Sequence, residues 1–410
     1  MTNSHPTGTS ERPEILPLTS LRGLAALLIV VNHLALLLPQ IGHSSARPAF
    51  VKTGLLGMTV FFVLSGFVMY YNYAHRIASS PSAGTVRFIF ARIARLYPLL
   101  IVYVLFNFGL NIARSIATGD AASASTFMTT LPLYLIGVQT WFYAVINGIN
   151  VSVSQYYGNP AWSISAELFF YLVFVPVIIL RGKSGPSVAR GVMVVIASVA
   201  CRTLFIAIAS MPAVQSWIGG KFGVSPTLSV DYWLIYYSPY GRCFEFFAGL
   251  GLAEIWLARN APVPSLVRRL GMLTGLAGIA YIVVSFGSES VFHAPRLFED
   301  NATNIGYVAA VPPAIFFLSR SEAFASRVLT FAPLLFIGEI SYSLYLVHTN
   351  VEPVFHVSPE TVLSDHVGMA IARCVLFIGV SLLIATASYR FVEMPARLQV
   401  LRFLRKFHPD

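Results

Sequence analysis

Apolar stretches long enough to cross a lipid bilayer recur along the whole sequence. A transmembrane helix needs about 20 mainly apolar residues. Because 56% of the 410 residues are hydrophobic and only 11% are charged, a water-soluble fold could not bury this much apolar surface. Eleven candidate stretches lie at 18–38, 54–73, 96–113, 127–146, 162–180, 191–211, 233–257, 270–286, 305–318, 331–351 and 369–391. The sequence therefore predicts an all-α, polytopic membrane protein.

Positive charge in the connecting segments predicts the orientation. The segment after the second stretch carries four arginines, Arg76, Arg87, Arg92 and Arg95. Basic loops stay on the cytoplasmic side, and the basic loop at 181–190 reaches that side only if 127–146 does not cross fully. We therefore expect about ten transmembrane helices, cytoplasmic N and C termini, and an outer-face or re-entrant segment at 114–160. Acidic residues, Glu352 among them, dilute the charge of the outer side.

The expected organisation is a single transmembrane domain at 17–397 between two cytoplasmic tails, 1–16 and the basic 398–410, with no appended soluble domain. The net charge of +10 follows from the loop asymmetry. No basic cluster is interleaved with polar or aromatic surface, which argues against a nucleic-acid partner. The three cysteines lie in apolar stretches, so neither a disulfide framework nor a metal site is expected.

Two ionisable residues lie within the first apolar stretch. Charged side chains in hydrocarbon cost several kcal/mol (about 2.5–3.5 on insertion scales) and often mark functional sites. Arg22 and His33 are eleven residues apart, so they share a helix face and lie about 16 Å apart along the axis. The alternative interpretation is a snorkelling arginine and a histidine that bonds a neighbouring carbonyl.

Seven segments in a fixed order resemble acyltransferase family 3, the integral membrane O-acyltransferases. They are Arg22 followed after ten residues by His33, then GLLGMTVFFVLSGF (54–67), RIARLYP (92–98), NPAWSISAELFFY (159–171), GRCFEFFAG (241–249), ISYSLYLVH (340–348) and FVEMPAR (391–397). The resemblance extends over nearly the whole chain, from about residue 18 to residue 397.

The resemblance implies an O-acyltransferase of the O-acetyl type in the cell membrane, with the bacterial inner membrane as its expected location. The donor would be cytoplasmic acyl-CoA, expected to be acetyl-CoA, without a metal. The acceptor would be a hydroxyl of a glycan, a lipid-linked sugar or a small glycosylated molecule. The competing hypothesis is a multispan transporter that uses intramembrane Arg, His and Glu as a proton or substrate relay.

Within this hypothesis His33 is the expected base, because an imidazole can remove a hydroxyl proton near neutral pH. Arg22, Arg92 and Arg95 would bind the phosphates of acyl-CoA. Arg92 and Arg95 are three residues apart and should face the same way, at the cytoplasmic end of their helix. Their alternative role is positive-inside flanking or lipid contact.

Glu167 is the second expected catalytic residue, which would orient a histidine such as His33 or His348. Its alternative role is that of an acid near a helix N-terminus, which the helix dipole favours. No activated serine or cysteine stands out, which favours direct transfer over an acyl-enzyme.

Further residues are expected to bind substrate or to support the site, and each has an ordinary structural alternative. Arg242 has Glu245 three positions on and could form an intrahelical pair, while Ser65 and Gly66 could be a helix-packing notch. The remaining members of this group are Trp162, Ser163, Tyr345 and His348.

Overall fold

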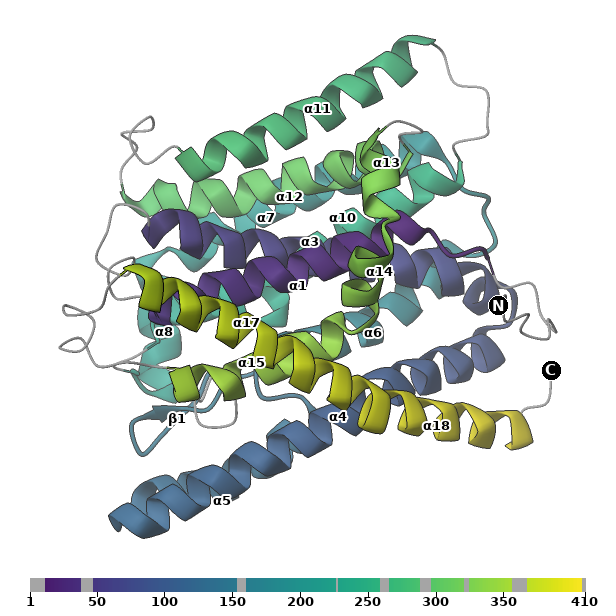
Figure 1. Cartoon of the computed structure of the whole chain (residues 1–410). Coiled ribbons are helices and arrows are strands. Elements are labelled where there is room, and N and C mark those ends of the chain that lie inside the picture. The colour runs from purple at the N-terminus through teal and green to yellow at the C-terminus, as the bar shows by residue number, and fades with distance from the viewer. Residues whose placement is uncertain are drawn as a thin grey trace.

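The computed structural model describes residues 12–37, 47–152, 160–225, 228–258, 265–287, 296–320, 324–355 and 367–407. The tail residues 1–11 and 408–410, named above as parts of the two tails, lie outside these ranges. Helices form most of the described chain (Figure 1). Their bounds are α1 Leu16–Leu37, α3 Arg47–Ser79, α4 Pro81–Thr118, α5 Ala121–Ile136, α6 Ala161–Arg181, α7 Val188–Ala209, α8 Pro212–Phe222, α9 Val230–Tyr232, α10 Pro239–Leu257, α11 Ser265–Gly287, α12 Arg296–Arg320, α13 Phe324–Leu329, α14 Ala332–Glu339, α15 Ser341–Phe355, α17 Val367–Ser388 and α18 Met394–Phe407, with π-helical segments η2 Trp233–Tyr237 and η3 Tyr389–Glu393.

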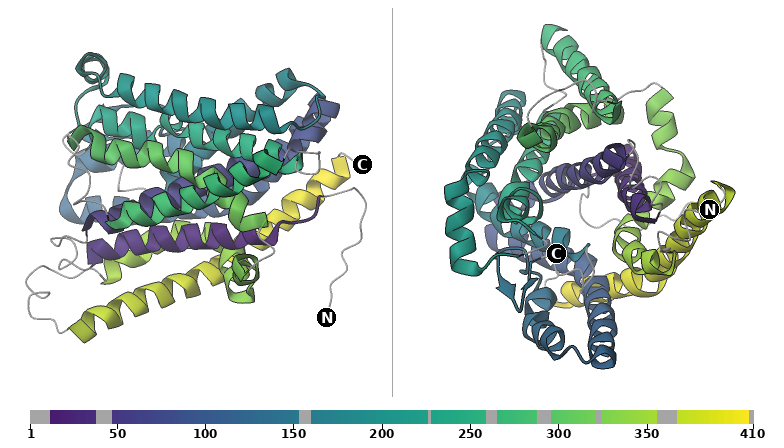
Figure 2. Two further views of the ribbon diagram at one scale, coloured as in Figure 1. Left: turned by 90° about the horizontal axis from the view of Figure 1, so that it is seen from above. Right: turned by 90° about the vertical axis from the view of Figure 1, so that its left-hand side faces the viewer.

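Helices α1 and α3 lie near the middle of the bundle, and the other helices surround them when it is viewed end-on (Figure 2). Helix α3 packs along α1 on one side and along α10 on another, and α10 packs in turn against α7. Helix α14 runs across the direction of the long helices, beside the start of α1 (Figure 1). The first helix is therefore held in place by partners from both halves of the sequence.

Two glycines allow α3 and α10 to approach each other closely. A Cβ atom at Gly66 would lie 1.9 Å from the carbonyl oxygen of Phe246, and one at Gly249 would lie 2.0 Å from that of Val63. Neither distance leaves room for a methyl group, so the helices meet backbone to backbone, as small residues permit in membranes. The packing interpretation of Gly66 is therefore confirmed, whereas its neighbour Ser65 faces a cavity.

Within the described ranges, seven helices are long and apolar enough to cross a membrane. They correspond to α1, α3, α4, α6, α7, α11 and the continuous rod of α17, η3 and α18. Helix α10 is of comparable length but carries Arg242, Glu245 and Glu254. The multispan helical architecture is thus as expected, while the count of ten and the side of each terminus stay predictions.

Two of the predicted spans are wrong as continuous helices. The stretch 331–351 divides into α14 and α15, which meet at Ile340. The stretch 233–257 divides into η2 and α10. Here Pro239 occupies the first turn of α10 and the Ser238 side chain accepts a hydrogen bond from the Gly241 N–H, a common way to begin a new helix. Arg242 consequently lies in the first turn of α10 and not nine residues into a helix.

The described part of the predicted outer-face or re-entrant segment, residues 114–152, doubles back on itself, while the prediction itself stays open. Helix α5 runs back along α4, and the Tyr97 hydroxyl donates to the Ile136 carbonyl (2.9 Å) at the end of α5. The chain then returns through a short antiparallel hairpin, β1 Val145–Ile146 and β2 Ile149–Asn150. Its Asn-Gly turn has two positive φ angles, which suits a tight two-residue loop.

The close contact between α3 and α10 makes a stability prediction. Gly66→Ala should lower the free energy of unfolding by about 1–3 kcal/mol, because its methyl group must displace backbone. The measurement is the thermal unfolding midpoint of the purified protein in detergent. Gly109→Ala in α4 is the matched control, since no heavy atom lies within 4 Å of the added Cβ. Equal stability of the two variants would contradict the close contact.

The orientation can be tested with single cysteines at the two ends of α7. Lys183 precedes this helix and Lys221 follows it, and both side chains are exposed. In a background without the three native cysteines, a cysteine at position 221 should react with an impermeant thiol reagent on intact cells, whereas one at 183 should react only after lysis. The reverse pattern would place both termini on the outer side.

Candidate active site

A cavity of about 690 Å³ opens at the end of the bundle where α1 begins. Segment 12–15 and Arg397 of α18 lie at its mouth, and Met58, Phe61 and Tyr345 lie at its inner end. Residues of α3 line it from Met58 to Asn72, which corresponds to a depth of about 21 Å at 1.5 Å per residue. The cavity therefore extends from one end of the bundle well into its interior.

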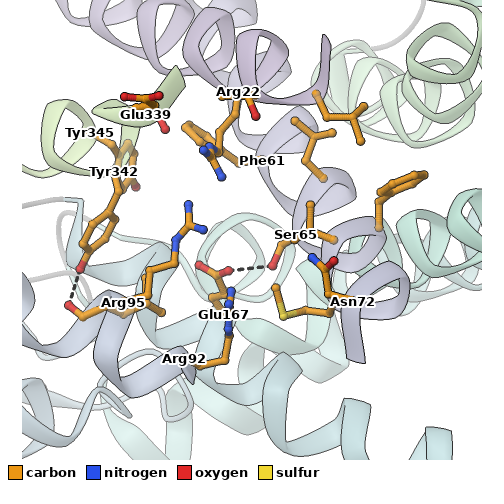
Figure 3. A pocket seen from close by; sticks show the side chains of 18 of the residues that line it. Arg22, Phe61, Ser65, Asn72, Arg92, Arg95, Glu167, Glu339, Tyr342 and Tyr345 are labelled. Atoms are coloured by element: carbon orange, nitrogen blue, oxygen red, sulfur yellow. Dashed lines mark hydrogen bonds between the residues drawn. The ribbon is translucent and has the colours of Figure 1, made fainter. Parts of the chain in front are cut away.

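Seven of the residues singled out from the sequence line this cavity, and Figure 3 shows several of them pointing into it. They are Arg22, Ser65, Arg92, Arg95, Ser163, Glu167 and Tyr345. They come from α1, α3, α4, α6 and α15, so the cavity is formed by segments that are far apart in the sequence. Trp162, Arg242, His33 and His348 are not among the lining residues.

The arginines of the cavity are bound mainly by neutral groups. Arg22 donates from Nε and Nη2 to the Gly338 carbonyl oxygen (3.2 and 3.0 Å). Arg92 donates to the Tyr73 hydroxyl (3.0 Å), with its guanidinium 5.2 Å from the centre of that ring. Within the described residues, no cavity arginine forms an ion pair with a cavity glutamate. Four glutamates, Glu14, Glu167, Glu339 and Glu393, line the same cavity, so its net positive charge is smaller than the arginines alone would give. The guanidinium groups are nonetheless outside close ion pairs within the described chain, which leaves them able to donate hydrogen bonds to a ligand.

Arg95 and Arg397 have no hydrogen-bond partner within the described part of the chain. Both line the cavity, and they lie close enough for their charges to repel each other. Like charges held together at an open cavity are typical of sites that bind an anion. Arg397 was not singled out from the sequence, although it belongs to the FVEMPAR segment.

Arg92 is placed differently from the prediction. Helix α4 begins at Pro81, well before the expected start at residue 96, so Arg92 and Arg95 lie within the helix and not at its cytoplasmic end. Arg92 is only 8% exposed. The two side chains do share one cavity, as their spacing predicts.

Glu167 belongs to the cavity and not to the histidines. Its Oε1 accepts hydrogen bonds from the Ser65 hydroxyl (2.7 Å) and the Tyr171 hydroxyl (2.5 Å). The carboxylate that the structure brings to His33 is Glu352. The pairing of Glu167 with a histidine is therefore wrong in this structure.

His33 and Glu352 form a partly buried pair between α1 and α15. The His33 Nδ1 lies 3.1 Å from the Glu352 Oε2, and the two side chains are 14% and 20% exposed. A carboxylate at Nδ1 keeps the imidazole hydrogen on that nitrogen, which leaves the lone pair on Nε2. Glu352 was interpreted as an outer-loop charge, but it lies four residues after His348 on the same helix face.

His348 lies against this pair. Its ring centroid is 4.9 Å from that of His33 in an edge-to-face arrangement, and its side chain is fully buried. The Tyr345 ring, which lines the cavity, lies 6.1 Å from the His348 ring and 5.8 Å from the Phe61 ring. The two histidines therefore lie directly behind the inner end of the cavity.

Trp162 and Arg242 form the structure behind the cavity wall. Arg242 pairs with Glu245 (3.0 Å), with its guanidinium 5.1 and 5.2 Å from the rings of Phe62 and Tyr236. Trp162 packs against the same two rings. This arrangement supports the Phe62 wall and favours the intrahelical pair over contact with substrate. No cluster of three or more metal-ligating side chains occurs among the described residues.

Comparison with known proteins identifies the family of this chain. A family model for the acyltransferase domain matches residues 17–390. The peptidoglycan O-acetyltransferase OatA of Listeria monocytogenes is 24% identical over 399 residues, covering 92% of this chain and 55% of the relative. The acyltransferase MdmB of Streptomyces mycarofaciens is 27% identical over 341 residues, covering 81% of this chain and 77% of the relative. The chain thus spans about half the length of the Listeria protein. No solved structure matches the chain.

Proposed function

The chain belongs to acyltransferase family 3, and we propose that it transfers an acetyl-type acyl group from acyl-CoA to a hydroxyl of a carbohydrate acceptor. The observation that carries this proposal is a single cavity that has arginines along it and a histidine–carboxylate pair behind its inner end. Arginines without ion-pair partners lie at its mouth and along its wall, and a histidine–carboxylate pair lies behind its inner end.

The cavity suits a long donor with an anionic head. The diphosphate and ribose phosphate of acyl-CoA would bind Arg95 and Arg397, whose side chains form no hydrogen bond in the described chain, together with Arg22. Guanidinium groups bind phosphate through paired hydrogen bonds. The pantetheine arm would lie along α3 toward Phe61 and Tyr345, so that the thioester arrives near the histidines.

The histidine pair suits removal of a proton from a hydroxyl. Glu352 would orient the His33 ring and stabilise the imidazolium that forms when Nε2 accepts the proton. Because His33 and Glu352 are partly exposed, the acceptor would reach them from the end of the bundle opposite the cavity mouth. The predicted orientation, which rests on the charge asymmetry of the loops, would put that end on the outer side of the membrane.

The acceptor class follows from the relatives and not from the geometry alone. The Listeria relative is named for peptidoglycan, so we propose a glycan hydroxyl, with acetyl-CoA as the donor. The transporter hypothesis makes a different prediction, because it requires a substrate to cross the membrane without formation of an ester.

The donor site can be tested without turnover. Arg95→Ala and Arg397→Ala should each raise the dissociation constant of acetyl-CoA about tenfold or more, since a charge-assisted hydrogen bond contributes roughly 1.5–3 kcal/mol. Isothermal titration calorimetry of the purified protein measures this constant. Arg269→Ala is a matched control, because that side chain is exposed on α11 outside the cavity. Unchanged affinity in both cavity variants would remove acyl-CoA from the proposal.

The base can be tested by comparing two substitutions of His33. His33→Ala and His33→Gln should both lower the transfer rate by about 10²–10⁴-fold, because a general base contributes this much. Glutamine keeps the size and hydrogen bonding of the side chain but cannot accept the proton. Acetyl-CoA affinity should stay near that of the parent in both. A Gln variant that transfers at close to the parental rate would make His33 a structural residue.

A further inference from the structure

One buried nitrogen beside the proposed site is unexplained by the mechanism above. The His348 Nδ1 lies 3.1 Å from the Leu344 carbonyl oxygen. A carbonyl oxygen only accepts, so Nδ1 carries the hydrogen and Nε2 carries the lone pair. This Nε2 is buried and has no hydrogen-bond partner among the described residues. Buried polar atoms are usually paired, and an exception in a cleft often marks a function.

His348 lies nearer to the cavity than His33 does, so the donor would reach His348 first. It lies directly behind Tyr345, which lines the cavity. His33 lies on its other side with Glu352, and these two side chains are partly exposed while His348 is fully buried. The order from the cavity toward the opposite end of the bundle is therefore Tyr345, His348, His33 and Glu352.

We propose that His348 is a catalytic nucleophile whose Nε2 carries the acyl group between the donor and the acceptor. The inference rests on the proposed acyl transfer and adds a covalent step to it. The sequence analysis favoured direct transfer because no activated serine or cysteine stands out. A histidine nucleophile would supply the activated side chain that an acyl-enzyme needs. A neutral imidazole with a fixed Nδ1 hydrogen presents an uncharged nucleophile at Nε2.

The first step exchanges a C–S bond for a C–N bond. The Nε2 lone pair of His348 attacks the thioester carbonyl carbon, the C–S bond breaks, and its electron pair leaves with the CoA thiolate. The CoA thiolate then leaves along the cavity and takes a proton from water at its open mouth. The acyl-imidazolium keeps its Nδ1 hydrogen on the Leu344 carbonyl oxygen.

The second step exchanges the C–N bond for a C–O bond. The acceptor hydroxyl loses its proton to the His33 Nε2, and its oxygen bonds the acyl carbon. The C–N bond breaks and its electron pair returns to the Nε2 of His348. His33 then releases the proton to water, so the sum is acyl-CoA and an alcohol converted to an ester and CoA.

The test separates the two histidines without an acceptor. Purified protein mixed rapidly with acetyl-CoA should release a burst of about one equivalent of free CoA thiol, the signature of an acyl-enzyme. His33→Gln should keep the burst, because His33 acts only in the second step, and should retain the acetyl group on a peptide that contains His348. His348→Gln should lose the burst. His75→Gln, exposed near the end of α3, is the matched control and should behave as the parent.

A second measurement uses the parental protein, in case the His348 variant does not fold. An acyl-enzyme must catalyse exchange of labelled CoA into acetyl-CoA when no acceptor is present, and His33→Gln should do the same. Transfer to an acceptor without a burst and without exchange would overturn the proposal and establish direct transfer. A burst that persists in folded His348→Gln would also overturn it. Failure of the parent to bind acetyl-CoA at all would instead reject the proposed function.

Discussion

A charge within an apolar helix bundle needs a partner, and the partners of the buried charges decide how this molecule is built. Arg242 is matched by Glu245 and by two aromatic rings. Glu254 accepts hydrogen bonds from Arg181 (3.0 Å) and from Arg190, which lies in the first turn of α7. Each of these arginines lies against a carboxylate, although Nε, Nη1 and Nη2 of Arg242 form no hydrogen bond among the described residues. The charges of these pairs are therefore largely neutralised within the protein. The cavity arginines differ, because none of them forms an ion pair within the described residues, although four glutamates line the same cavity. Arg22 and Arg92 instead donate to a carbonyl and a hydroxyl oxygen.

In the proposed mechanism the interior holds two regions, an anion-binding region formed by the cavity arginines and a proton-transfer region formed by the histidine–carboxylate pair. The anion-binding region depends on α4 and α18, which bring Arg95 and Arg397 together in one cavity. The proton-transfer region depends on α1 and α15, which bring His33 to Glu352. Helix α1 links the two regions, because Arg22 and His33 lie on one face of a single helix.

The helices and one face of the site could be predicted from the sequence, because both follow from regular helix geometry. The apolar stretches located the long helices, and the spacing of Arg22 and His33 placed them correctly on one face. Glu352 could have been found, since it follows His348 by four residues on the same face. Ser238 and Pro239 are likewise a recognisable helix start. The approach of Arg397 to Arg95 and the break at Ile340 have no local signal, because both depend on tertiary contacts such as that of Gly338 with Thr19.

The central claim is that donor and acceptor reach one site from opposite faces of the membrane. The most direct measurement uses sealed proteoliposomes with radiolabelled acetyl-CoA inside and soluble peptidoglycan fragments outside. The account predicts ester-linked label on the fragments in this arrangement, and none when both compounds are outside. Labelling with both compounds on one side of sealed vesicles would contradict two-sided access, and passage of either compound without ester formation would favour a transporter.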